Sequence, residues 1–235
     1  MMRPFIEYVS RYQPSFGSTL RGASQSEIAT LASTAQAVLP ASYQEFLAVM
    51  GHGDGGLRLT FDGSTDISDV IRRYESFAKT GRAAAPPNCI LIGLGTLAME
   101  GLCMWLLRGR EPSIVFTRDG RVTGLYAESL EKLLYRTAFL KFGIKQFPCA
   151  TYLASLPPAR ISETATTIAL ESGFRTLWFS DPIAFCGEKP GAAIVVNQYD
   201  GEGASVVLRG TDQGALDTIA AALEHACDVR RQASR

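Results

Sequence analysis

The chain has 235 residues, of which 46% are hydrophobic and 20% are charged. This composition is typical of a soluble globular protein and excludes a disordered or fibrous chain. Lys and Arg together number 23, as do Asp and Glu, so the chain lacks the basic excess of a nucleic-acid-binding protein. We therefore expect no nucleic-acid partner. A chain of this length has room for one large domain or two small ones.

The cysteine spacing matches neither a zinc site nor a disulfide framework. The five cysteines are scattered and never form a CxxC pair: Cys89, Cys103, Cys149, Cys186 and Cys227. We expect reduced, mostly buried thiols in a cytoplasmic protein. The N-terminus lacks a signal-peptide pattern. Glycines and Glu100 interrupt the most apolar run, and a membrane span needs about 20 apolar residues, so we expect no membrane segment.

Two capping boxes predict two consecutive helices near the N-terminus. Ser24 with Glu27 begins the first, Pro40 ends it, and Ser42 with Glu45 begins the second. The first helix has its apolar stripe at Ile28, Leu31, Ala32, Ala35 and Val38. The second has its apolar face at Tyr43, Phe46, Leu47 and Met50.

The glycine-rich stretch GHGDGG follows the second helix. Gly51 stands where a C-terminal glycine cap is expected. A phosphate loop leads into a helix N-terminus, whereas this stretch meets the negative end of a helix dipole. We therefore interpret it as a helix stop and turn. A direct ligand site is the alternative, with His52 as a general base whose partners come from elsewhere.

The next residues predict a strand, a loop and a helix. Residues 57–61 alternate as in a strand with one buried face, 62–69 form a polar loop, and 70–80 read as a helix. The loop contains alternating acidic and polar residues, but an EF-hand needs Gly at its sixth position and Glu at its twelfth. Ile67 and Arg73 stand there, so an EF-hand is excluded.

A strand pattern and a helix complete the N-terminal part. Residues 89–92 and 113–117 read as strands, and Asp119-Gly120 is a hairpin signal. The helix after them has its apolar stripe at Leu130, Leu133, Leu134 and Ala138. Trp105 lies in an apolar run and is expected in the core.

After Gly143 the pattern restarts. A connector, a helix and three strands are predicted, in that order, at 146–160, 161–172, 174–180, 192–199 and 204–209. A last helix has its stripe at Leu216, Ile219, Ala220 and Leu223. The tail from Asp228 is expected to fray, and Trp178 is expected in the core.

Catalytic and cofactor patterns are weak. Gly93, Gly95 and Ala98 match the dinucleotide pattern G-x-G-x-x-A after a strand. Only one βαβ unit is visible, however, and the same segment reads as a strand hairpin. The chain has no G-x-S-x-G, and His52 and His225 are its only imidazoles, so neither nucleophilic catalysis nor metal binding is favoured.

A longer run of motifs supports a family resemblance. An E-I-x-x-L helix is followed by LPxxYxxFLxxxGxGxG, a strand, an I-L-I-G segment, a strand ending in DG, and AESLEKLL. The matching positions are Glu27, Ile28, Leu31, Leu39, Pro40, Tyr43, Phe46, Leu47, Gly51, Ile92, Gly93, Ala127, Glu128, Ser129 and Leu130. This run resembles the Smi/Knr-like proteins of the SUKH superfamily. It departs from them at Ala32, where the family often has glutamate.

The resemblance implies an α+β fold. Residues 1–143 would form a SUKH-like domain with helices packed on one face of a curved, mainly antiparallel sheet. Residues 144–235 would form a smaller C-terminal α/β segment that lies outside the resemblance. GLGTLA would be a turn between strands.

The resemblance also implies a function. SUKH proteins are similar in role to immunity proteins that bind and neutralise a cognate bacterial polymorphic or contact-delivered toxin. The chain would then be a non-enzymatic binding protein without a cofactor or metal, with a toxin as its partner, and it could also pair with a second copy of itself.

The resemblance does not transfer the binding surface, because such surfaces vary with the toxin. We take the loop after the second helix as the candidate, at Asp54, Arg58, Asp62, Asp66 and Asp69. A merely solvated acidic loop is the alternative.

Two other functions stay open. One is a regulatory or scaffold module built on the same fold, which a neighbouring toxin gene would disfavour. The other is a nucleotide-binding enzyme using Gly93 and Gly95. Thermal shift with NAD, NADP and ATP would test it, because a ligand specific for the native state raises stability.

Overall fold

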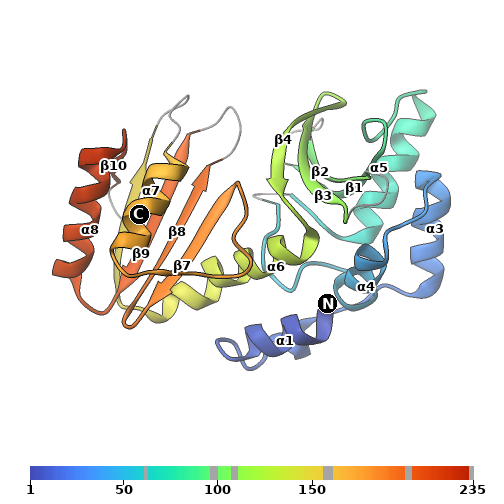
Figure 1. Cartoon of the computed structure of the whole chain (residues 1–235). Helices are drawn as coiled ribbons and strands as arrows, with labels where there is room; N and C mark the ends of the chain where they lie inside the picture. Colours follow the sequence, from blue (N-terminus) through green and yellow to red (C-terminus); the bar gives the residue numbers. More distant parts are fainter. Residues whose placement is uncertain (61–62, 96–99, 107–110, 156–160, 199–202, 233–235) are drawn as a thin grey trace. The chain divides into compact units, whose positions relative to one another are not determined.

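The computed structural model describes residues 1–60, 63–95, 100–106, 111–155, 161–198 and 203–232. The chain is a mixed α+β protein with two compact units, Met1–Thr137 and Ala138–Arg235 (Figure 1). Each unit has its own antiparallel sheet. Among the described residues, no helix is both long and apolar enough to cross a membrane.

In the N-terminal unit a run of helices precedes a four-stranded meander. The helices are α1 (Met2–Ser10), α2 (Phe16–Thr19), α3 (Gln25–Ala35), α4 (Ala41–Met50) and α5 (Ile67–Lys79). The strands pair in chain order as β1 (Cys89–Leu94), β2 (Glu100–Trp105), β3 (Ser113–Arg118) and β4 (Arg121–Ala127), and α6 (Leu130–Ala138) follows.

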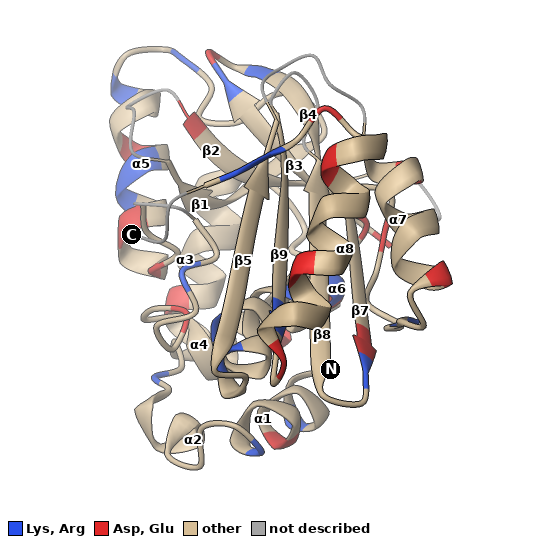
Figure 2. Cartoon of the chain, turned by 90° about the vertical axis from the view of Figure 1, so that its left-hand side faces the viewer, with Lys and Arg blue, Asp and Glu red and all other residues tan. Residues whose placement is uncertain are grey.

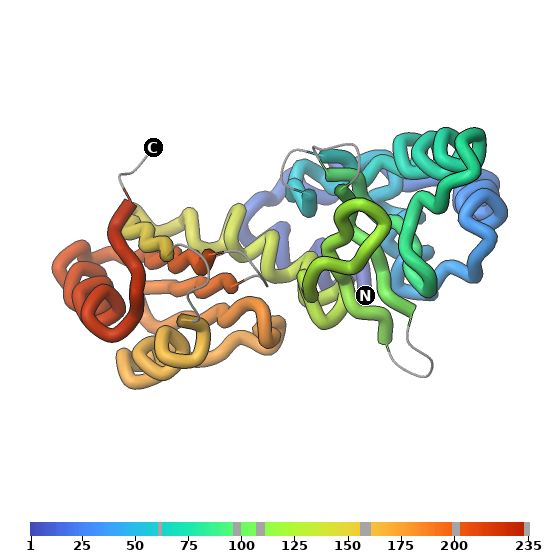
Figure 3. The backbone as a smooth tube through the Cα atoms, turned by 90° about the horizontal axis from the view of Figure 1, so that it is seen from above, coloured from blue at the N-terminus to red at the C-terminus, as the bar shows by residue number. Residues whose placement is uncertain are grey.

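Helix α5 connects the helices to the sheet of this unit. It packs against α3 and against the edge strand β1, and Figure 3 shows α5 in teal beside α3 in blue. The Tyr74 hydroxyl of α5 accepts a 2.9 Å hydrogen bond from the Leu91 amide of β1. Burial raises the pKa of Tyr74 to about 12, so this hydroxyl keeps its proton.

The first capping box is confirmed and the second is wrong. Ser24 caps α3 and Glu27 completes the box. Pro40 is the N-cap residue of α4, which begins at Ala41, so Ser42 lies inside the first turn and caps nothing. Glu45 instead accepts a 2.7 Å hydrogen bond from the Met2 amide.

The predicted apolar face is confirmed for α4 but only in part for α3. All four predicted core residues of α4 are buried, namely Tyr43, Phe46, Leu47 and Met50. Helix α3 ends earlier than predicted, because Gln36 takes the left-handed conformation with φ 51°. Val38 therefore lies beyond the helix and is 89% exposed, against the prediction that it belongs to the stripe.

The β3–β4 hairpin is confirmed at the predicted turn. Asp119 has φ 52° and Gly120 has φ 73°, and two adjacent positive angles are those of a type I′ turn. That turn suits the right-handed twist of the paired strands, which explains why Asp-Gly is found there. Helix α6 is also confirmed, and Leu130, Leu133 and Leu134 are buried.

The C-terminal unit is a six-stranded antiparallel sheet with order β10-β5-β9-β8-β7-β6. Its elements are η1 (Phe139–Gly143), η2 (Ile144–Gln146), β5 (Cys149–Ala154), α7 (Ser162–Glu171), β6 (Arg175–Thr176), β7 (Ala184–Lys189), β8 (Ala192–Gln198), β9 (Ala204–Gly210), α8 (Gln213–Ala226) and β10 (Arg230–Arg231). Helices α7 and α8 pack against the sheet. The core between them includes Leu153, Ile194, Val206, Leu208 and Leu223.

Three sequence predictions fail in this unit. The supposed connector at 146–160 contains β5, and the strand predicted at 174–180 is reduced to the two residues of β6. The tail does not fray before Gln232, because β10 pairs with β5. Tertiary pairing decides these segments, and their local sequence pattern is too short to show it.

Both tryptophans are more exposed than predicted. Trp105 is 37% exposed at the end of β2, and Trp178 is 56% exposed in the turn before β7. Trp178 packs edge-on against the buried ring of Phe179, with ring centroids 5.7 Å apart.

Candidate functional site

The loop between α4 and α5 also contacts the first turn of α3, so it brings three helices together. Gly51 follows α4 directly, and its φ of −65° is one that any residue could adopt. The glycine is needed for close packing: a Cβ there would lie 2.5 Å from both the Ala23 Cβ and the Leu47 carbonyl oxygen. The Gly51 carbonyl then accepts a 2.7 Å hydrogen bond from Ile67, the first residue of α5. GHGDGG is thus a packed helix stop, as its position after a helix predicts.

His52 lies between two carboxylates. Its Nε2 is 3.1 Å from Glu27 Oε1 and its Nδ1 is 3.6 Å from Asp66 Oδ2. Glu27 belongs to the first turn of α3, while Asp66 caps α5 by accepting from the Ser68 amide at 2.8 Å. Carboxylates near helix N-termini are stabilised by the dipole. His52 therefore links the starts of two helices.

The serine near this cluster is not arranged as a nucleophile. Ser24 Oγ donates to Glu27 Oε2 at 2.7 Å, so the carboxylate and not the imidazole receives its proton. This hydrogen bond, that of the Ser24 amide and the nearby His52 lower the pKa of Glu27. The cluster has the geometry of a helix cap extended by a histidine.

Asp54 shapes the loop around Arg58. Its Oδ2 accepts from the Leu59 amide at 2.6 Å and its carbonyl oxygen accepts from the Leu57 amide at 3.0 Å. Leu57 and Leu59 are each only 2% exposed. Arg58 between them has φ 62°, a left-handed conformation that costs a non-glycine residue free energy. The strand predicted at 57–61 is therefore wrong in its described part.

Arg58 is the exposed residue of this turn. The described part of the chain offers its side chain no hydrogen bond and no ion pair. Two buried neighbours and the Asp54 carboxylate thus hold the backbone, while Arg58 itself is exposed. The surrounding residues thus hold an exposed side chain on a backbone conformation that is unfavourable by itself.

Asp69 lies in the first turn of α5, not in the predicted loop, and has structural contacts. Asp69 accepts from Ser64 Oγ at 2.7 Å and from Arg72 Nη1 at 2.8 Å. Asp62 lies outside the described residues. Sequence reasoning placed Asp54, Arg58, Asp66 and Asp69 on one loop, but it missed Glu27 and His52 as partners. The capping box at Glu27 places a carboxylate at the start of α3, and this was the one sequence feature that could have indicated Glu27 as a partner.

The G-x-G-x-x-A stretch has the spacing of a hairpin. Strand β1 ends at Leu94 and β2 begins at Glu100, and the two are antiparallel neighbours, which leaves too few residues for a crossover helix. Gly93 lies within β1, where a Cβ would be 2.8 Å from Thr60 Cγ2. Ala98 lies outside the described residues.

A shallow hollow lies beside α5. Its lining includes Arg73, Phe77, Pro86, Leu91 and Thr117. Its volume of about 20 Å³ holds roughly one water molecule, far below the few hundred Å³ of a typical small-molecule site.

The cysteines are described throughout, and none forms a disulfide. Cys103, Cys186 and Cys227 are buried, whereas Cys89 and Cys149 are partly buried. Burial raises the pKa of Cys103 to about 12 and that of Cys89 to about 11, so both are protonated, weakly reactive thiols at neutral pH. No metal-binding group of three or more His, Cys, Asp or Glu occurs among the described residues.

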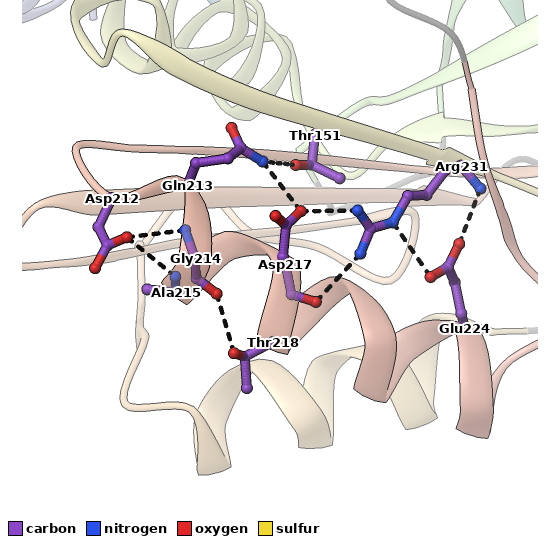
Figure 4. Close-up of polar contacts among 9 residues, drawn as sticks. All are labelled: Thr151, Asp212, Gln213, Gly214, Ala215, Asp217, Thr218, Glu224 and Arg231. Atoms are coloured by element: carbon purple, nitrogen blue, oxygen red, sulfur yellow. Dashed lines mark hydrogen bonds and ion pairs between the residues drawn. The ribbon is translucent and has the colours of Figure 1, made fainter.

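A second polar cluster holds the C-terminal strand on α8 (Figure 4). Arg231 Nη1 contacts Asp217 Oδ1 at 2.7 Å, and its Nε contacts Glu224 Oε2 at 3.3 Å. Gln213 Nε2 lies 3.1 Å from both Thr151 Oγ1 and Asp217 Oδ1. These contacts join α8 to β10 and β5, so the cluster is structural.

No family model matches the chain, and no curated protein matches it either.

Proposed function

We propose that the chain is a binding protein that recognises another protein through the loop between α4 and α5. The observation that carries this proposal is the left-handed, exposed Arg58 between two buried leucines. Backbone strain of this kind persists only where the surroundings impose it, and it concentrates at ligand-binding sites. A loop that is already ordered loses little entropy on binding.

The chemistry of the loop indicates what the partner presents. An arginine guanidinium pairs best with a carboxylate, through two parallel hydrogen bonds, and arginine is enriched among interface residues with the largest binding energies. The carboxylates of Asp54 and Asp66 belong to the same loop, and Asp69 follows in the first turn of α5. A partner with an acidic group facing Arg58 and basic groups around it would be complementary, which increases the association rate and the specificity.

The function we propose is that of a cytoplasmic immunity protein that neutralises a cognate bacterial toxin. The support for this role is the resemblance of the helix–loop motif, from Glu27 through Gly51, to SUKH proteins, together with the α+β fold. In this role the protein needs neither a catalytic residue nor a cofactor. It works by covering or distorting the active site of the toxin.

Co-expression tests this proposal. Cells that make the toxin encoded beside the gene are expected to survive when they also make this chain, and the two proteins are expected to co-purify. Arg58→Glu should reduce survival and co-purification, whereas Arg175→Glu, an exposed arginine on β6 of the other unit, should change neither. Death of cells that hold the wild-type chain, without a recoverable complex, would refute the role.

A further inference from the structure

We draw no further inference here: the strongest candidate, the side-chain cluster of Tyr152 and Arg209 on the face of the C-terminal sheet opposite α7 and α8 (Figure 2), carries none, because Arg209 already donates hydrogen bonds to the Phe147 carbonyl oxygen and the Tyr152 hydroxyl, and nothing among the described residues shows what covers that face.

Discussion

His52 Nε2 lies 3.1 Å from Glu27 Oε1, which joins the loop after α4 to the first turn of α3. The contact is partly exposed, with side-chain exposures of 30% and 37%, so salt should screen it. We expect His52→Ala and Glu27→Gln to be non-additive in a double-mutant cycle at low salt. The coupling should shrink in high salt. Additive effects at low salt would show that the pair contributes no stabilisation.

Acidification gives a second test of the same carboxylate. Hydrogen bonds from Ser24, with a smaller contribution from His52, lower the pKa of Glu27 in the folded chain. A lowered folded-state pKa stabilises the protein above the unfolded pKa, and this stabilisation disappears as the pH falls through the folded value. Urea midpoints of wild type and Glu27→Gln should therefore begin to converge below about pH 5 and should meet only when the pH is below the lowered folded-state pKa. A constant difference from neutral to acidic pH would contradict the assignment.

Tyr43 should tolerate the loss of its hydroxyl. Its ring is fully buried, and its hydroxyl oxygen has no hydrogen-bond partner among the described residues. Burial raises its pKa, so the group stays neutral. Because an unpaired buried hydroxyl costs about 1–3 kcal/mol, Tyr43→Phe is expected to raise the free energy of unfolding by about 1 kcal/mol. A loss of stability in chemical denaturation would indicate a hydrogen bond that the structure lacks.

Two glycines should differ in what they tolerate. Gly51→Ala would push a methyl group against Ala23 and Leu47, and overpacking of this kind costs about 1–3 kcal/mol. Gly120 has φ 73° and open space around it, so Gly120→Ala should cost only the left-handed conformation, about 1 kcal/mol. Thermal unfolding of both variants measures the difference. Equal melting temperatures would mean that Ala23 can move aside.

The C-terminal strand should depend on Arg231. Its side chain contacts Asp217 and Glu224 of α8, and both carboxylates are partly exposed. Arg231→Ala is expected to destabilise the C-terminal unit by about 1 kcal/mol, since exposed ion pairs are weak singly but stronger in a network. Arg230→Ala, on the same two-residue strand, is the control. Amide exchange of β5 should increase in the first variant and not in the second.

Local signals allowed much of the fold to be predicted from the sequence. The capping box at Ser24, the apolar face of α4 and the Asp119-Gly120 turn each depend on residues a few positions apart, and each is confirmed. The α+β class was instead implied by the family resemblance, and the structure shows it. Strand β10 could not be predicted, because its two residues are held by pairing with β5 and by α8.

In the candidate site, too, the features that depend on nearby residues could be predicted and those that depend on packing could not. The sequence places Asp54 and Asp66 on one loop, but nothing in the spacing brings Glu27 beside His52, because α3 and α4 must pack first. The alternation at Leu57 and Leu59 was read as a strand. Both leucines are buried as that pattern predicts, yet the Asp54 carboxylate bends the backbone at Arg58 into a turn. A side-chain hydrogen bond to a nearby amide can override an alternating pattern.

The most direct test of the proposed immunity role is titration calorimetry of the purified chain with the toxin that this role requires to be encoded beside its gene. We predict nanomolar binding by the wild-type chain and by Arg175→Glu. Binding by Arg58→Glu should be at least about 100-fold weaker, which is about 2.7 kcal/mol. Equal affinities of the three proteins, or no heat of binding for the wild type, would contradict a toxin-neutralising role centred on Arg58.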